Sequence, residues 1–387
     1  MKRPALLALA LLVLWPAPEA AAAIKRHIAF GDSITDGFGD PEGTGYVRRL
    51  KRILEKETDD DIEILKSAIP GEETSEALSR ISSALAGGGD TLLLMEGTND
   101  VTAISQGRVS LETVIQNLDS LAVTAERRGF EVIHATIFPR SPKALRDSNN
   151  LRTQFLTWEI RALAYQKKRR LVDIYEAFDP EIVEDAFELY YFQDIDPVGH
   201  PSADGYERIA RTFADVMTEV DNVPPVIGTF FPGPLPSEIP PDIEIRVPVY
   251  EPLGASGIDM KSSTMLINGR PAGESNGNRR RLEFVFSDAE SIGCKVVLGI
   301  RSEDRANPEN TMDRLLAIYN VTGRSVLAGD VDFDCRVDGF DLVSFAWGFG
   351  TQAGDDRYQR RFDLNTDGFV DGDDLAILAK NFSRSSL

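Results

Sequence analysis

Ser33 follows a short apolar run, residues 28–30, and precedes a polar, glycine-rich stretch, which is the arrangement of a strand that ends in a turn. A serine hydroxyl becomes a nucleophile when a base takes its proton and hydrogen-bond donors stabilise the oxyanion. The chain contains three histidines, His27, His134 and His200. His27 precedes the first apolar run and His134 lies within a later one, so His200, in a polar loop, is the best candidate for the base.

A histidine base needs a carboxylate that holds its ring in the tautomer that accepts a proton from serine. Asp194 and Asp196 precede His200 in the same loop. Either aspartate could orient the ring, and we favour Asp196. These residue types together predict acyl transfer through a covalent intermediate.

The C-terminal residues 327–387 contain an internal repeat with the spacing of calcium ligands. Oxygen-bearing side chains recur at positions 1, 3, 5, 9 and 12 of two loops, and position 7 of each loop supplies a backbone carbonyl. The first loop has Asp330, Asp332, Asp334, Arg336, Asp338 and Asp341, and the second has Asp363, Asn365, Asp367, Phe369, Asp371 and Asp374. We therefore expect a small helical, EF-hand-like module with two structural Ca²⁺ sites. The clustered carboxylates of the first loop should repel one another without the metal, so this module should fold poorly until calcium binds.

The candidate nucleophile and base belong to residues 24–220, where short apolar runs alternate with longer amphipathic ones. This alternation predicts an α/β domain with a parallel sheet between layers of helices. We expect strands at 28–30, 62–65, 91–95, 132–136 and 171–174. Helices are expected at 45–57, 75–85, 111–125, 150–168 and 202–220.

With the strand order 2-1-3-4-5, the first and third strands are neighbours at the point where the order reverses. Ligands bind beyond the carboxyl ends of the strands at such a point. The turn that carries Ser33 and the turn 97–100, which contains Asn99, follow these two strands. We expect both turns to line one crevice.

The remaining segments predict an exported protein of several domains. Residues 1–23 have a basic start, an apolar run and small residues near their end, as a secretory signal peptide does, and this run is too short to span a bilayer. Seven prolines in residues 221–241 predict an extended linker. Alternating apolar residues in 242–326 predict a small all-β sandwich that acts as a spacer or a surface-binding module.

The charge of the chain restricts its partners. It carries 62 acidic and 42 basic residues, a formal net charge of −20, which argues against binding to the phosphate backbone of nucleic acids and favours binding of cations. The only two cysteines are Cys294 and Cys335, and the sequence leaves open whether they pair or remain separate thiols.

Four short blocks of residues 24–220 resemble the SGNH hydrolases, also called GDSL-type esterases. In chain order they contain Ser33, Gly71, Asn99 and His200. The resemblance implies a three-layer α/β/α, flavodoxin-like fold, with Ser33 as nucleophile and His200 as base. It also implies an oxyanion hole from the backbone N–H groups of Ser33 and Gly71 and the side chain of Asn99. The family usually places its aspartate three residues before the histidine, but this chain has Pro197 at that position. Asp196 is one residue further from His200. A Ser-His dyad without an aspartate is the alternative.

The C-terminal repeat resembles type I dockerin modules, and the middle segment is similar to bacterial immunoglobulin-like spacers. The dockerin resemblance implies calcium-supported helices that bind cohesin domains, and surface attachment or docking within the chain are the alternatives. Two features depart from the dockerin pattern. Position 6 of the first loop, usually glycine, is Cys335. Positions 10 and 11, which are residues 339–340 in the first loop and 372–373 in the second, lack the small hydroxyl residues that are frequent there.

The sequence therefore predicts a secreted serine esterase that needs no catalytic cofactor and possesses a calcium module for attachment. Acetylated polysaccharide is the substrate that export and the dockerin-like module suggest by association. Lipase, lysophospholipase and thioesterase activities use the same machinery, and a non-catalytic carbohydrate-binding or scaffold protein is the alternative from another class.

Overall fold

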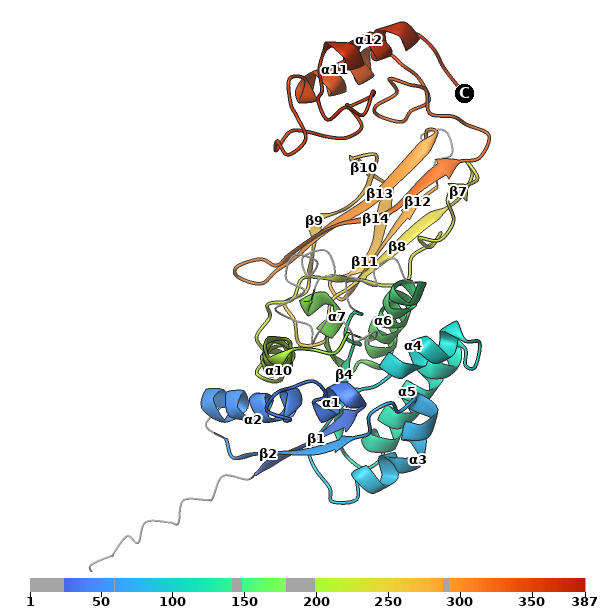
Figure 1. Cartoon of the computed structure of the whole chain (residues 1–387). Coiled ribbons are helices and arrows are strands. Elements are labelled where there is room, and N and C mark those ends of the chain that lie inside the picture. Colours follow the sequence, from blue (N-terminus) through green and yellow to red (C-terminus); the bar gives the residue numbers. More distant parts are fainter. Residues whose placement is uncertain (1–23, 59, 141–147, 179–198, 288–291, 387) are drawn as a thin grey trace, which may run out of the picture.

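The computed structural model describes residues 24–58, 60–140, 148–178, 199–287 and 292–386. Figure 1 shows an α/β domain, a β-sandwich and a small helical module that follow one another along the molecule. Residues 1–23, which resemble a signal peptide in sequence, lie outside the described residues. None of the helices in the described part combines the length and apolar character that a membrane span requires.

The α/β domain is built on a five-stranded parallel sheet of order β2-β1-β3-β4-β5. Its strands are β1 (Lys25–Gly31), β2 (Ile62–Ala68), β3 (Thr91–Met95), β4 (Glu131–Ala135) and β5 (Arg170–Val172). The expected α/β fold class and strand order are confirmed. Because successive side chains of a strand point to opposite faces, Ala29 and Leu93 lie in one core while Ile28 and Leu92 lie in the other.

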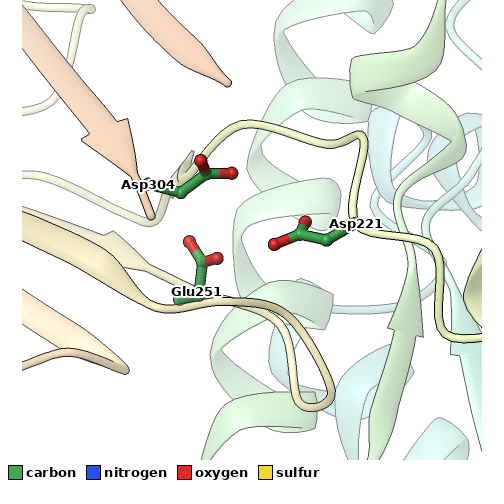
Figure 2. A group of neighbouring side chains, drawn as sticks. All are labelled: Asp221, Glu251 and Asp304. Atoms are coloured by element: carbon green, nitrogen blue, oxygen red, sulfur yellow. The ribbon is translucent and has the colours of Figure 1, made fainter. Parts of the chain in front are cut away.

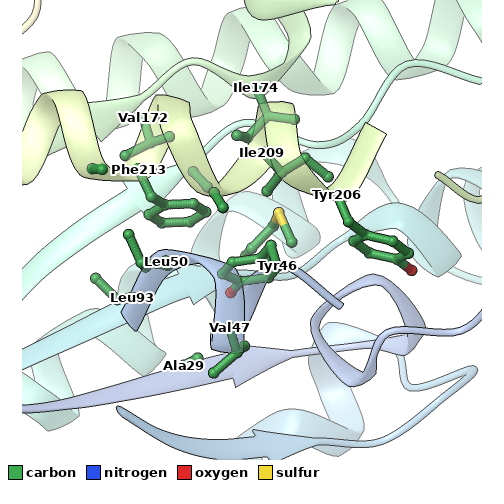
Figure 3. Packing of buried hydrophobic residues seen from close by; sticks show 14 of the residues in the cluster. Ala29, Tyr46, Val47, Leu50, Leu93, Val172, Ile174, Tyr206, Ile209 and Phe213 are labelled. Carbon is green, nitrogen blue, oxygen red and sulfur yellow. The ribbon is translucent and has the colours of Figure 1, made fainter. Parts of the chain in front are cut away.

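Helices cover both faces of this sheet. On one face, α2 and α10 pack closely, and the rings of Tyr46 and Phe213 stack with centroids 5.0 Å apart (Figure 3). The helices on this face are α2 (Gly45–Thr58), α7 (Ile174–Ala177) and α10 (Ala203–Met217). Those on the other face are α3 (Thr74–Ala84), α4 (Thr98–Ser105), α5 (Leu111–Glu126) and α6 (Ser148–Lys167). A strand buried on both faces is mostly apolar, and β3 is buried at every position and apolar from Leu92 to Met95.

Two sheets form the sandwich, with strand orders β10-β9-β13-β14-β7 and β11-β12-β8-β6. Their strands are β6 (Val226–Ile227), β7 (Glu238–Ile239), β8 (Ile245–Tyr250), β9 (Ile258–Ile267), β10 (Arg270–Ala272), β11 (Glu274–Asn278), β12 (Arg281–Phe286), β13 (Lys295–Asp304) and β14 (Thr311–Val321). Asn268 and Gly269, with φ of 53° and 79°, join β9 to β10 in the tight turn that this dipeptide favours.

The proline-rich segment 221–241 is more than an extended connection. Its β6 pairs with β8 at the edge of one sheet, and its β7 pairs with β14 at the edge of the other. The sequence did not indicate these pairings, because each strand has two residues and lies among prolines. The segment therefore closes both sheets of the sandwich.

The C-terminal module has two helices, α11 (Gly339–Gly348) and α12 (Gly372–Asn381), each preceded by an acidic loop. Its buried apolar core is small and consists of Val331, Val337, Phe345, Phe362, Val370 and Leu378. The chain end returns to the first loop, where Ser383 N–H donates to the Val337 carbonyl. A core of this size contributes little stability, so other bonds must hold the module together.

Candidate active site

Ser33 and His200, which are far apart in the sequence, lie in hydrogen-bonding contact in the structure. The distance from Ser33 Oγ to His200 Nε2 is 2.8 Å, and the two residues are 8% and 9% exposed. Ser33 begins the short helix α1 (Ser33–Asp36) beyond β1, and His200 lies just before α10. With the Nε2 atom unprotonated, this contact lets the imidazole accept the hydroxyl proton.

Local sequence explains how the turn holds Ser33. A Cβ at Gly31 would come within 2.1 Å of Thr35 Oγ1 and 2.4 Å of the Met95 carbonyl, so only glycine lets the strand turn this tightly. Asp32 caps the short helix by accepting a hydrogen bond from Ile34 N–H at 2.9 Å. The serine is thereby fixed at the carboxyl end of β1.

The loop that contains Gly71 and the turn that contains Asn99 meet at the same end of the sheet. The Asn99 side-chain amide donates to the Glu72 carbonyl at 2.8 Å. Gly71 has φ of 82°, a left-handed conformation that suits glycine. Asp100 joins the two elements further, because its carboxylate accepts from both the N–H and the hydroxyl of Thr74. The structure therefore joins Ser33 to His200, and Asn99 to the loop that contains Gly71.

Arg80 connects β1, β2 and the Gly71 loop. Its guanidinium pairs with the Glu72 carboxylate, donates to the Gly31 and Ser67 carbonyls, and lies 3.8 Å from the centroid of the Phe30 ring. Sequence reasoning did not identify Arg80, because an arginine on a helix has no pattern that reveals which loops it will reach.

Glu96 is a second residue near this site that the sequence analysis missed. Its carboxyl group is buried and has no hydrogen-bond partner within the described ranges, although Arg80 Nη2 lies 3.6 Å away. Burial and the nearby carboxylates of Asp32 and Glu72 raise the pKa of Glu96 well above its usual range. The environment therefore favours the neutral acid at this position.

One of two aspartates is expected to orient the imidazole of His200. Asp194, Asp196 and Pro197 lie in 179–198, outside the described residues. The ring of Phe38 also lies beside the imidazole, with its centroid 4.5 Å from that of His200. Phe38 is half exposed, and its carbonyl accepts a hydrogen bond from the Tyr206 hydroxyl at 2.6 Å.

Replacement of Asp32 with asparagine should alter how stability depends on pH. Burial raises the pKa of Asp32 from 3.8 to about 6. The folded protein binds the proton of the Asp32 carboxyl group more tightly than the unfolded chain does. Protonation of Asp32 therefore contributes fully to the stability of the fold below about pH 4, and this contribution is lost as the pH rises through 6. An asparagine side chain would still cap the helix but would not titrate. The free energy of unfolding of Asp32→Asn should therefore lack the decrease, of up to about 3 kcal/mol, that ionisation of Asp32 causes in the wild type.

Urea unfolding of both proteins at pH 4 and pH 7 measures this difference. The exposed Asp204, in the first turn of α10, supplies the control variant Asp204→Asn, which should follow the wild type at both pH values. Parallel pH profiles for wild type and Asp32→Asn would contradict the prediction.

The two acidic loops of the C-terminal module have matching backbones. Position 4 has φ of 64° in Phe333 and 63° in Thr366, and position 6 has φ of 75° in Cys335 and 91° in Gly368. Cys335 therefore adopts the left-handed conformation that glycine adopts in the second loop. Cysteine in place of glycine at position 6 therefore leaves the backbone conformation of the first loop like that of the second.

Side chains in the two loops also correspond. Asp338 and Asp371, at position 9, cap α11 and α12, while Asp341 and Asp374, at position 12, complete capping boxes. At position 7, the N–H groups of Arg336 and Phe369 each donate to the position 5 carboxylate at 2.9 Å. Asn365 donates to Asp367 at 2.9 Å within the second loop.

The donor set of the first loop fits a hard cation. Carboxylate oxygens of Asp330, Asp332 and Asp334 lie within 4.8 Å of one another. Oδ1 of Asp330 is buried and has no hydrogen-bond partner in the described parts of the chain. Oxygen-only ligands at this spacing are those that Ca²⁺ prefers. Three of the positions expected to bind calcium thus lie close together in the first loop.

Both cysteines are buried thiols at the boundary between the sandwich and the C-terminal module. Cys294 Sγ donates to Asp330 Oδ2 at 3.1 Å, so it contacts the first position of the first acidic loop. Burial raises the pKa of both thiols, Cys294 and Cys335.

Comparison with known proteins identifies two parts of the chain. Residues 29–208 match the GDSL-like Lipase/Acylhydrolase family, and residues 328–383 match the Dockerin type I domain. The chain therefore carries a GDSL acylhydrolase domain followed by a dockerin type I domain, and the first of these defines an ester hydrolase. Dockerin domains typically bind calcium, imply a cohesin partner and occur in extracellular enzymes. The search of curated proteins finds no match.

Several solved structures are similar to about half of this chain. A lipase/acylhydrolase from Enterococcus faecalis is 21% identical, with 49% of this chain and 93% of that chain covered at a TM-score of 0.43. An acetylxylan esterase from Geobacillus stearothermophilus is 22% identical, with 50% of this chain and 94% of that chain covered at a TM-score of 0.44. An alpha/beta hydrolase from the metagenome of Lake Arreo, Spain, is 22% identical, with 52% of this chain and 98% of that chain covered at a TM-score of 0.45.

Proposed function

We propose that this protein is a secreted serine esterase in which Ser33 is the nucleophile and His200 the general base. The contact of 2.8 Å between Ser33 Oγ and His200 Nε2, inside the region that matches the acylhydrolase family, carries this proposal. Asp196, or Asp194, holds the imidazole from the segment outside the described residues. The reaction needs no cofactor, because serine, imidazole and amide donors supply every proton transfer and charge contact.

In the first half of the reaction, Ser33 Oγ attacks the ester carbonyl carbon while His200 takes the hydroxyl proton. The carbonyl oxygen becomes an alkoxide, which the N–H groups of Ser33 and Gly71 and the Asn99 amide stabilise. Collapse of this intermediate breaks the bond to the alcohol, and His200 gives the leaving oxygen its proton. Water then repeats the sequence on the acyl-serine and releases the carboxylic acid.

The Asn99 amide has two N–H groups, and Glu72 accepts a hydrogen bond from one of them. The other is available for the alkoxide. Because Asp100 and Thr74 clamp the two loops, Gly71 and Asn99 keep their relative position before substrate binds. Donors fixed in advance need no reorganisation during the reaction, which is the main source of oxyanion stabilisation.

The substrate that we propose is an acetylated polysaccharide. A dockerin domain directs an enzyme to an extracellular assembly, where polymeric esters are available. The half-exposed ring of Phe38 packs against His200, the group that protonates the leaving alcohol, so it provides an apolar surface beside the alcohol portion of the ester. Sugar rings pack well on such surfaces.

A substrate panel tests this proposal with the full-length protein. Acetate release from acetylated xylan and acetylated pectin should exceed, in kcat/KM, the hydrolysis of phospholipids, long-chain aryl esters and acyl thioesters. Faster phospholipid or thioester cleavage would reassign the substrate class. Tight glycan binding in calorimetry, with none of these esters cleaved, would instead indicate a binding protein.

We also propose a role for each remaining segment. Residues 1–23 act as the signal peptide, 24–220 form the hydrolase domain, 221–241 lead into the sandwich, 242–326 serve as an immunoglobulin-like spacer, and 327–387 form the dockerin module. Two calcium ions, held by the two acidic loops, stabilise this last module, and a cohesin is its partner.

A further inference from the structure

Three carboxylates meet where the hydrolase domain joins the sandwich. Asp221 follows α10, Glu251 follows β8, and Asp304 ends β13, so they come from segments that are distant in the sequence. One carboxylate oxygen from each lies within 4.8 Å of the other two. Figure 2 shows the three side chains pointing toward a common centre.

Among the described residues, Glu251 has a hydrogen-bond partner for only one of its two carboxylate oxygens. The residue is 2% exposed, and Oε1 accepts a hydrogen bond from Gly257 N–H at 3.2 Å. Oε2 is buried and has no hydrogen-bond partner in the residues that the structure describes. Burial raises the pKa of Glu251 to about 8. In its ionised form, a buried carboxylate oxygen that is aimed at two further carboxylates needs a positive ligand to compensate its lost hydration.

Protein cations do not supply this compensation. Within the described ranges, no lysine or arginine forms an ion pair with Asp221, Glu251 or Asp304. Arg280, whose charge acts on Glu251, directs its guanidinium to the Pro252 carbonyl. In the described part of the chain, the three acids therefore face one another without a basic side chain between them.

The other two carboxylates are already held in place. Asp304 accepts hydrogen bonds from Ala306 N–H at 3.0 Å and Asn310 N–H at 2.9 Å through Oδ1, and from the Asn310 amide at 2.7 Å through Oδ2. Asp221 accepts from Ser256 N–H at 2.6 Å. A carboxylate has about four lone-pair positions, so both groups keep capacity for another ligand. The site is thus preorganised.

We propose that Asp221, Glu251 and Asp304 bind a calcium ion that fastens the hydrolase domain to the sandwich. Three carboxylates without nitrogen or sulfur ligands select a hard cation, and their negative charge suits a divalent one. Calcium accepts six to eight oxygens in flexible geometry, which three carboxylates and waters can provide on the partly exposed side of Asp221. This site is separate from the two acidic loops of the dockerin module.

Counting calcium in the full-length protein tests this site. After equilibrium dialysis at micromolar free calcium, Glu251→Gln should contain one ion fewer per chain than the wild type, because the amide keeps the shape and loses the charge. The matched control is Glu244→Gln, which changes a partly exposed glutamate just before β8 that pairs with Arg246. The control should keep the wild-type count. This difference of one ion is expected whether or not the dockerin loops also bind calcium.

A second variant, Asp221→Asn, covers the case in which Glu251→Gln does not fold. Asp221 is only partly buried, and its replacement should weaken calcium binding at one site by about tenfold or more. Near-UV circular dichroism and ester hydrolysis verify that each variant is folded. An unchanged calcium count in folded Glu251→Gln, or unchanged calcium affinities in Asp221→Asn, would overturn the proposal.

Discussion

Ser33→Ala should reduce kcat for ester hydrolysis by roughly four to six orders of magnitude, as loss of a serine nucleophile does in comparable enzymes. Alanine removes Oγ, the atom in contact with His200, and leaves nothing to form the acyl intermediate. Loss of this hydrogen bond should cost only about 1 kcal/mol of stability, so the variant should unfold within a few degrees of the wild type. A short-chain aryl ester provides the assay.

The control for this variant is Ser79→Ala, which removes an exposed hydroxyl that donates to the Glu76 carbonyl on α3. It should retain full activity. A fluorophosphonate, which forms a covalent bond with activated serines, should label the wild type and Ser79→Ala but not Ser33→Ala. Equal rates in all three proteins, or labelling elsewhere than Ser33, would show that this serine is not the nucleophile.

Removal of calcium should unfold the dockerin module while the hydrolase domain stays active. Six buried apolar side chains form the core of this module, and the first loop alone contains five aspartates. Without the metal their repulsion opposes folding, whereas metal binding adds its free energy to stability. Trp347, half exposed on α11, lies in the module and reports its unfolding by fluorescence.

The expected result is a loss of the folded Trp347 signal on chelation and its return on addition of calcium. Asp330→Asn and Asp363→Asn, each at position 1 of a loop, should raise the calcium concentration at half-recovery. The exposed Asp356, which lies between the loops, gives the control Asp356→Asn, with unchanged recovery. Fluorescence that is insensitive to chelator would contradict calcium dependence of this module, and would leave the junction site to its own test.

The parts of the fold that the sequence predicted are those encoded by local patterns. The short apolar run of β3 and the 3.6-residue repeat of α5 are examples of patterns that predicted a strand and a helix. The sheet order then brought the turns of Ser33 and Asn99 to one end of the sheet. Motif residues were found because each follows a strand or precedes a helix that the pattern already located.

The parts that could not be predicted depend on packing between distant segments. Arg80 reaches Glu72 and two backbone carbonyls only because α3 crosses beside β1. The carboxylate of Glu251 meets Asp304 only after the strands of the sandwich have paired. No spacing of residues in the sequence predicts either arrangement, because the contacting side chains come from different elements that meet only in the tertiary structure.

The proline-rich segment determines how far the enzyme can reach from its point of attachment. A flexible linker of this length would let the hydrolase domain explore a wide volume around a bound dockerin. Here β6 and β7 join the two sheets, Trp158 of α6 lies in the sandwich core, and Arg314 of β14 pairs with Glu176 at 2.7 Å. At the other end, Arg270 pairs with Asp332 of the dockerin module at 2.8 Å. Ser33, the proposed nucleophile, therefore lies in a domain that these contacts join to the sandwich and, through it, to the dockerin module, so the place and orientation of docking should decide which esters it can reach.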